Sequence, residues 1–251
     1  MSELPNGTVP AWEVLDETWE RALVVVAHPD DMEYGGAAAV ARWTQLGKHV
    51  AYALVTSGEA GIDGLDPEAA RPLRETEQRA SCAVVGVTDV EFLGFPDGTV
   101  EYGLPLRRAV AAAVRRHRPD VVITANFRET YGGVALNQAD HIAVGRAVLD
   151  GARDAGNRWV FRDLLDQGLE PWNKVRQIWA VASPDAGHGV DVTDTFHLGV
   201  DSLREHRAYL AGLGEGAGDP AEFLESFARM SGSRLGCTLA VGFEVFPLQL
   251  F

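Results

Sequence analysis

The sequence of 251 residues predicts an α/β protein with a Rossmann-like fold, in which a mainly parallel sheet carries helices on both faces. Two observations predict this fold class. Short apolar runs alternate along the chain with longer segments of helical pattern, and this alternation implies right-handed crossovers between parallel strands. The apolar runs are also continuous, which is typical of strands that are buried on both faces.

Each element follows from these patterns. The expected strands are Leu23–Ala27, Val50–Thr56, Val90–Leu93, Val121–Ala125, Ile178–Ala182, Val190–Val192 and a last strand near Leu239–Phe246. The expected helices are Gly35–Leu46, Leu73–Val85, Leu106–His117, Ala139–Ala155, His197–Leu210 and Pro220–Met230. Gly47, Gly86 and Gly156 directly follow three of these helices and Pro119 comes shortly after another, and both residue types end helices.

The chain is expected to form one domain. Its length fits one large α/β domain or two small ones, and a hydrophobic content of 46% is enough for a full core. Residues 1–20 are interpreted as an N-terminal extension, and residues 21–251 as a single α/β domain. The Gly-rich stretch from Gly212 to Asp219 is expected to be a flexible loop, and the tail after it is too short for a second domain.

Charge and composition restrict the partners. The formal net charge of −14 argues against nucleic acid or an anionic membrane, because either would need a basic surface. A small-molecule substrate is expected instead, and homo-oligomerisation is left open. No signal peptide or membrane-spanning run is visible, so a cytoplasmic location is expected. Cys82 and Cys237 lie far apart and outside any CxxC pair, which favours two free thiols.

The most informative segment is Ala27-His28-Pro29-Asp30-Asp31-Met32-Glu33, which follows the first buried strand. It places one imidazole and two carboxylates at the tip of that strand. In open α/β sheets, ligands bind at the carboxyl ends of the strands. Histidine and aspartate are also ligands that zinc and similar divalent metals accept. The segment therefore indicates a metal site.

Spacing suggests how such a site is built. His28 and Asp31 are three residues apart and can face one point, with Pro29 fixing the turn. The best third ligand is His141, which lies at the start of a later helix. Three protein ligands leave one position for water, whose pKa the metal would lower, and Asp30 lies beside that point without having to ligate. Ordinary explanations stay open: either aspartate could cap the next helix, and His141 could be a surface or core histidine.

On these residues, the chain resembles a known family. The first motif is similar to the AHPDDxE signature of the PIG-L/LmbE-like N-deacetylases, zinc-dependent enzymes that remove acyl groups from N-acetylglucosamine-type amino sugars. Other segments agree in order along the chain, namely Thr56-Ser57-Gly58-Glu59, Arg74-Glu75-Thr76-Glu77, Leu93-Gly94-Phe95-Pro96-Asp97-Gly98 and Asp140-His141. Weaker similarity continues through Val192-Thr193-Asp194 and His206 to Gly242-Phe243-Glu244-Val245-Phe246. The resemblance covers most of the chain after residue 20.

The resemblance implies roles for individual residues. One zinc ion would be held by His28, Asp31 and His141, with Asp30 as the general base. Arg74 and Asp97 would bind substrate by hydrogen-bonding the hydroxyls or pendant group of the sugar. The alternatives are a helix-surface ion pair for Arg74 with Glu77, and the turn position of a Pro-Asp-Gly sequence for Asp97.

One segment departs from the family. Gln138-Ala139-Asp140-His141 stands where the family usually has His-Pro-Asp-His, whose first histidine assists catalysis. Gln138 and Asp140 are therefore interpreted as catalytic residues. Gln138 can donate a hydrogen bond to an oxyanion, but it cannot carry a proton near neutral pH. The alternative is that Gln138 only faces solvent at the start of a helix.

The expected function is that of a metal-dependent hydrolase which removes an N-acyl group, with N-acetyl as the first expectation, from an amino sugar or its conjugate. Asp30 would take a proton from the zinc-activated water and pass it to the leaving amine. Two alternatives are an amidase for a larger N-acyl conjugate and a non-catalytic sugar- or nucleotide-binding module with a vestigial site. Bound metal together with turnover of an N-acetyl sugar would discriminate between them.

Overall fold

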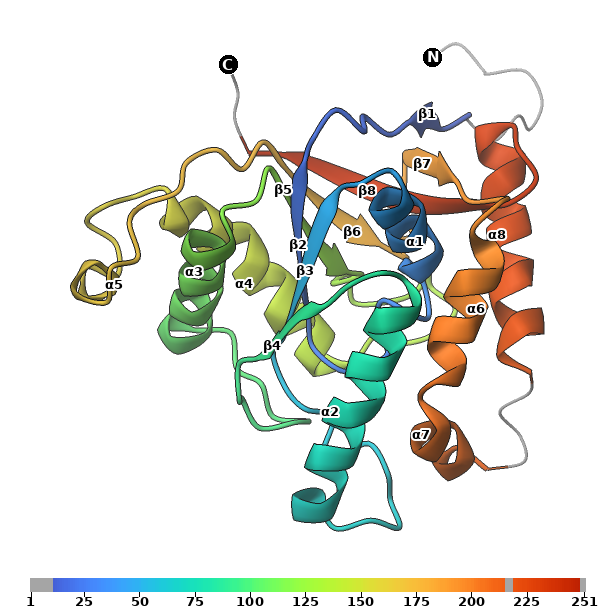
Figure 1. Ribbon diagram of the computed structural model, residues 1–251, viewed down its shortest axis with the longest axis horizontal. Helices are drawn as coiled ribbons and strands as arrows, with labels where there is room; N and C mark the ends of the chain where they lie inside the picture. Colours follow the sequence, from blue (N-terminus) through green and yellow to red (C-terminus); the bar gives the residue numbers. More distant parts are fainter. Residues whose placement is uncertain (1–10, 215–218, 249–251) are drawn as a thin grey trace.

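The computed structural model describes residues 11–214 and 219–248, and one mixed sheet runs through this part of the chain. The strands are β1 (Glu13–Val14), β2 (Arg21–Val26), β3 (His49–Leu54), β4 (Asp89–Phe92), β5 (Val121–Ala125), β6 (Gln177–Val181), β7 (His188–Asp191) and β8 (Ala240–Pro247). They lie side by side in the order β1-β7-β8-β6-β5-β2-β3-β4 (Figure 1). Only β8 is antiparallel to its neighbours among these strands, so the mainly parallel sheet is confirmed.

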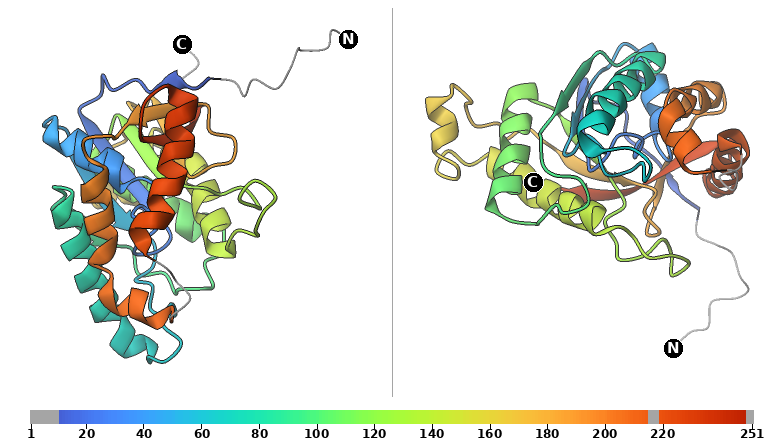
Figure 2. Two further views of the ribbon diagram at one scale, coloured as in Figure 1. Left: turned by 90° about the vertical axis from the view of Figure 1, so that its right-hand side faces the viewer. Right: turned by 90° about the horizontal axis from the view of Figure 1, so that it is seen from below.

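Helices cover both faces of the sheet (Figures 1 and 2). They are α1 (Ala37–Gln45), α2 (Pro67–Val84), α3 (Leu104–His117), α4 (Ala139–Ala155), α5 (Asp163–Asp166), α6 (Phe196–Arg204), α7 (Arg207–Gly212) and α8 (Pro220–Leu235). One core lies between the sheet and α1, and the other lies between the sheet and the pair α3 and α4. Val24 of β2 belongs to the first core and Val25 to the second, because successive side chains of a strand point to opposite faces.

Residues 11–20, in the expected N-terminal extension, pack against the rest of the protein. Glu13 and Val14 form β1, which pairs with β7 at the edge of the sheet. Leu15 and Trp19 are buried in the same core as α1. This strand was not expected, because the segment has too few apolar residues to show a strand pattern. The division into an extension and a single domain stays a prediction.

Helix α2 begins six residues earlier than expected, at Pro67 instead of Leu73. Asp66 is its N-cap, with a side chain that accepts a hydrogen bond from the Glu68 N–H, and Pro67 occupies the first turn, where a missing N–H is tolerated. Pro72 within the helix explains the difference, because an internal proline usually marks a helix end.

The helix expected over 197–210 is two helices, α6 and α7, separated at Glu205 and His206. The last helix runs five residues further than expected, to Leu235, and the short helix α5 was not expected at all. The loop expected over 212–219 lies partly outside the described residues, since 215–218 are not described. No helix among the described residues is long and apolar enough to cross a membrane.

The strand order positions the candidate site. The connection after β2 leads to β3 on one side, whereas the connection after β5, the other neighbour of β2, leads to β6 in the opposite direction. The carboxyl ends of β2 and β5 therefore form a topological switch point, where open α/β sheets bind ligands. The segment that begins at His28 follows β2, and the segment that leads to His141 follows β5, so both meet at this point.

Candidate metal centre

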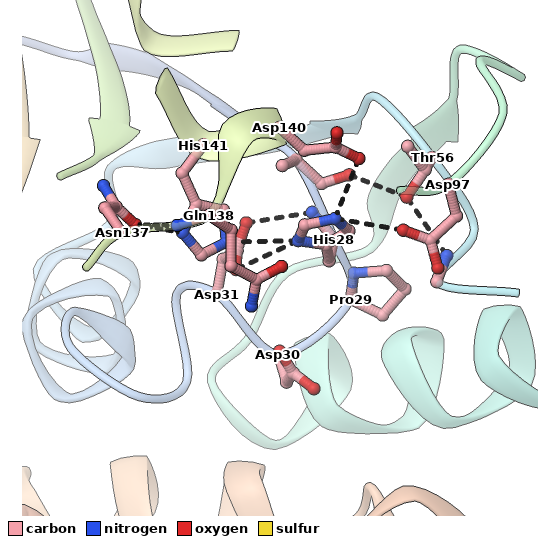
Figure 3. A network of polar contacts seen from close by, with 12 residues as sticks. His28, Pro29, Asp30, Asp31, Thr56, Asp97, Asn137, Gln138, Asp140 and His141 are labelled. Carbon is pink, nitrogen blue, oxygen red and sulfur yellow. Dashed lines mark hydrogen bonds and ion pairs between the residues drawn. The ribbon is translucent and has the colours of Figure 1, made fainter. Parts of the chain in front are cut away.

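Three side chains predicted as metal ligands converge at the switch point (Figure 3). Nε2 of His141 lies 3.0 Å from Oδ1 of Asp31 and 3.1 Å from Nδ1 of His28. Nδ1 of His28 lies 3.7 Å from Oδ1 of Asp31. His28 and Asp31 come from the turn between β2 and α1, whereas His141 comes from the first turn of α4. These three atoms form a group that can hold one metal ion.

The other nitrogen of His28 faces two carboxylates. Nε2 lies 3.0 Å from Oδ1 of Asp97 and 3.3 Å from Oδ2 of Asp140. Asp140 is itself held by the backbone N–H groups of Gly98 and Val100. A metal-bound histidine commonly donates its second ring N–H to a carboxylate, which leaves the other nitrogen free to ligate. The two aspartates therefore direct Nδ1 of His28 toward His141 and Asp31.

His141 is oriented in the same way by an amide. Its Nδ1 lies 2.8 Å from Oδ1 of Asn137, and the Tyr131 hydroxyl lies 3.3 Å from the same nitrogen. Nδ2 of Asn137 donates to the backbone carbonyls of Asn126 and Arg128, which establishes that its oxygen is the atom that faces the ring. His141 then carries its proton on Nδ1, and Nε2 is free to bind a metal.

The electrostatics of the group suit a cation. Burial opposes a charge on His28, but hydrogen bonds to Asp140, Asp31 and Asp97 raise the pKa of His28 to about 12. Burial likewise opposes ionisation of Asp31, but the two histidines hold the pKa of Asp31 well below its usual range. A proton on Nδ1 of His28 thus occupies the space between the three ligand atoms. Two imidazole nitrogens and one carboxylate oxygen are a donor set that zinc accepts, so the residues fit a divalent metal.

Asp30 lies beside this group and does not enter it. In Figure 3 its carboxylate points away from the three ligand atoms. Among the described residues, the hydrogen bond to that carboxylate comes from Nη2 of Arg74, 2.8 Å from Oδ2. Burial raises the pKa of Asp30 to about 6, although the Arg74 guanidinium acts in the opposite direction. A carboxylate whose pKa lies near neutral pH is suited to general base catalysis.

The remaining predicted residues have different surroundings. Arg74 is almost fully buried and its Nη atoms contact Pro29, Asp30, Glu77 and His206. Asp97 and Asp140 contact His28, as described above. Gln138 is exposed, and its side chain makes no hydrogen bond to the described residues. In Figure 3 its amide extends from the start of α4 toward the side of the cluster on which Asp30 lies. The catalytic and substrate-binding roles of these residues stay predictions.

Sequence reasoning assigned no role to two residues of the site. Asn137 directly precedes Gln138, and a polar residue at the end of a loop gives no sign that it will contact His141. His206 was noted only within the weaker family similarity, and it lay inside an expected continuous helix, so no role was predicted for it. In the structure it lies at the break between α6 and α7 and contacts Arg74.

The fold and the site together define a class: Rossmann-like proteins with a histidine- and aspartate-lined candidate metal site at the switch point of the sheet. Comparison with known proteins then identifies the family. The chain belongs to the PIG-L family, because the model of that family, described as GlcNAc-PI de-N-acetylase, matches residues 23–152. The family expectation drawn from the motifs is therefore confirmed.

Individual relatives and solved structures agree with the assignment to this family. The chain is 31% identical over 255 aligned positions to 1D-myo-inositol 2-acetamido-2-deoxy-alpha-D-glucopyranoside deacetylase of Kineococcus radiotolerans, an alignment that covers 87% of this chain and 63% of the relative. The structure of N,N'-diacetylchitobiose deacetylase from Pyrococcus horikoshii has the same fold, with a TM-score of 0.83 at 23% identity over 92% of this chain and 85% of that one.

The fold is not limited to deacetylases. GalB, the 4-carboxy-2-hydroxymuconate hydratase from Pseudomonas putida, superposes with a TM-score of 0.73 at 15% identity, over 92% of this chain and 98% of that one. Function must therefore be argued from the residues of the site, since one fold carries unrelated reactions.

Proposed function

We propose that the protein is a zinc-dependent deacetylase that hydrolyses the N-acetyl amide of an amino sugar conjugate. The observation that carries this proposal is the convergence of Nδ1 of His28, Oδ1 of Asp31 and Nε2 of His141 within 3.7 Å, with Asp30 beside them. Family membership supports the reaction class, and the Kineococcus relative is named for the removal of an acetyl group from an amino sugar linked to inositol.

The residues divide the chemistry between them. His28, Asp31 and His141 would hold the metal, which supplies a Lewis acid for the amide carbonyl and lowers the pKa of water. Asp30 accepts a proton from the attacking water and donates it to the leaving amine. Gln138 donates an amide N–H to the developing oxyanion, a role that its exposed and unbonded side chain leaves open to it.

The proposal also includes the class of substrate and a cytoplasmic location. The protein would act on a small N-acetylated sugar conjugate. The free thiols of Cys82 and Cys237 support a reducing, cytoplasmic setting.

The test combines metal content with turnover. Purified protein is expected to contain about one zinc per chain and to release acetate from an N-acetylglucosamine conjugate. His141→Ala is expected to lose the metal, because two remaining ligands hold it poorly. Asp30→Asn is expected to keep the metal and to lose turnover by about a hundred- to ten-thousand-fold.

Asp154→Asn is the matched control for Asp30→Asn, since Asp154 is also buried and paired with an arginine, Arg107, but lies outside the site. It is expected to retain turnover. An active Asp30→Asn variant, or one without metal, would show that the roles of the two aspartates are misassigned. Turnover is also measured on conjugates with longer acyl chains. Faster hydrolysis of these than of the N-acetyl conjugate would favour an amidase of larger substrates.

Gln138→Ala tests the oxyanion role separately. Loss of one such donor typically lowers kcat by about a hundred- to a thousand-fold, with metal content unchanged. Unchanged turnover would mean that Gln138 only faces solvent.

A further inference from the structure

A buried polar cluster lies behind Asp30, and the proposed mechanism does not use it. It is formed by Glu33 from the β2–α1 turn, Arg74, Glu77 and Gln78 of α2, and His206 from the break between α6 and α7. The His206 side chain is fully buried, with no exposed surface. A buried imidazole between two helices calls for an explanation, because polar groups are costly to bury without partners.

The contacts of His206 establish its tautomer. Nδ1 of His206 lies 3.2 Å from Nη1 of Arg74. Arginine has donors and no acceptor, so Nδ1 accepts this hydrogen bond and the ring proton is on Nε2. Nε2 faces Oε2 of Glu33 at 4.0 Å, and among the described residues neither atom has a hydrogen-bond partner. The direct contact of His206 with the site therefore runs through Arg74.

Arg74 connects His206 to the proposed base. Its Nη2 donates to Oδ2 of Asp30 and to the backbone carbonyl of Pro29, each at 2.8 Å. The guanidinium group is planar and rigid, so the acceptor at Nη1 helps to fix the direction in which Nη2 points. Glu77 also accepts from Nη1, at the longer distance of 3.3 Å.

The conformation of Asp30 depends on the hydrogen bond from Arg74. Its backbone has a φ of 86°, a left-handed conformation that is costly for a residue other than glycine. Its backbone N–H donates to Gln78, and Arg74 supplies the hydrogen bond to its carboxylate. Without a correctly placed Nη2, the carboxylate has no partner among the described residues to hold its rotamer.

We propose that His206 is a positioning residue for catalysis: by accepting from Arg74, it holds the guanidinium group in the orientation that places the Asp30 carboxylate. The proposal rests on the proposed function, since it takes Asp30 as the general base. The break between α6 and α7 is then a functional feature, because a continuous helix would not bring His206 to Arg74.

The test compares two substitutions at one position. His206→Asn retains an acceptor near the place of Nδ1, whereas His206→Leu has a similar bulk and no acceptor. His206→Leu is expected to lower kcat by about 10- to 100-fold with KM and zinc content unchanged, the scale of loss caused by misplacing a reacting group. His206→Asn is expected to recover most of that loss. Equal activity of the two variants, whether high or low, would overturn the proposal.

The control is His117→Leu, which removes another buried histidine that lies away from the site and contacts Asp89 and Glu91. It is expected to keep kcat, and thermal unfolding of all three variants verifies that they are folded. If His206→Leu does not fold, the comparison of His206→Asn with His206→Gln decides the matter. The longer glutamine side chain cannot place its oxygen at the position of Nδ1, so His206→Gln is expected to be the slower of the two, and equal rates would overturn the proposal.

A second readout does not need activity. Nitrogen-15 NMR of the imidazole groups, with His206→Asn used for assignment, is expected to show an unprotonated Nδ1 and a protonated Nε2 at His206. Arg74→Lys should shift the Nδ1 resonance. A proton on Nδ1 would overturn the proposal. If the tautomer is as expected but no N-acetyl sugar is hydrolysed, the proposed function fails while the contact between His206 and Arg74 stands.

Discussion

At the scale of single residues, the site uses each histidine for two contacts. Nδ1 of His28 and Nε2 of His141 face the space for a metal, while Nε2 of His28 faces Asp97 and Asp140 and Nδ1 of His141 faces Asn137. These outer contacts determine which nitrogen carries a proton. The chemistry of the metal centre thus depends on residues that would not touch the metal.

Proton release on metal binding is one consequence. The pKa of His28 is raised to about 12 in the metal-free protein, so its ring is an imidazolium at pH 7. A metal needs the lone pair on Nδ1, so binding must displace that proton. We expect about one proton to be released per zinc bound at neutral pH. Calorimetric titration of metal-free protein in buffers of different ionisation enthalpy measures this number, and a value near zero would contradict it.

The role of Asn137 can be tested by metal affinity. Asn137→Ala removes the acceptor for Nδ1 of His141, and loss of such an outer contact typically weakens metal binding by about 10- to 100-fold. Asn157→Ala is the control, because Asn157 lies beyond the end of α4, its side chain accepts from the nearby Trp159 N–H, and its contact with Arg115 uses the backbone carbonyl, which the substitution keeps. A zinc dissociation constant that is the same for both variants would exclude an orienting role.

The three candidate ligands, whose role stays a prediction, could be found from the sequence because they depend on local features. His28 and Asp31 follow a buried strand, and His141 begins a helix, so the topology of the sheet brings them together. The contact of His28 with Asp97 depends instead on the path of the loop after β4, which no periodic pattern describes. No role was predicted for His206 for a related reason, since tertiary contacts with α2 override the helical pattern that runs through 197–210.

At the scale of elements, α3 and α4 pack so closely that a glycine is required between them. A Cβ atom on Gly151 would lie 2.8 Å from Val110 and 2.9 Å from the backbone oxygen of Arg107. Alanine normally stabilises a helix relative to glycine, but here the close contact with backbone atoms prevents relaxation. His141 lies in the first turn of the same helix, α4.

We therefore expect Gly151→Ala to lower the free energy of unfolding by about 1–3 kcal/mol. Gly64→Ala is the control, because a Cβ at Gly64 would have no neighbour within 4 Å. Denaturant unfolding measures both variants. A Gly151→Ala protein as stable as the control would show that α3 and α4 can separate without cost.

At the scale of the whole molecule, an aromatic cluster joins the N-terminal segment to the sheet. Trp19 makes edge contacts with Trp43 of α1 and Trp179 of β6, with ring centroids 5.2 and 5.9 Å apart. Trp19→Ala should lower the free energy of unfolding by about 3–5 kcal/mol. Trp159→Ala should change it little, since the Trp159 side chain is largely exposed. Similar losses for both would mean that residues 11–20 do not contribute to the core.

The metal centre also has a consequence for the behaviour of the whole chain. His28 and His141 are 113 residues apart in the sequence, so a single ion held between them would act as a removable cross-link between the segments that follow β2 and β5. A ligand that binds only the native state stabilises it by mass action, by about 4 kcal/mol when its free concentration is a thousand times the dissociation constant. The melting temperature should therefore track free zinc, fall with a chelator, and lose this response in His141→Ala. The stability of the protein would then depend on the metal supply of its surroundings as well as on its own sequence.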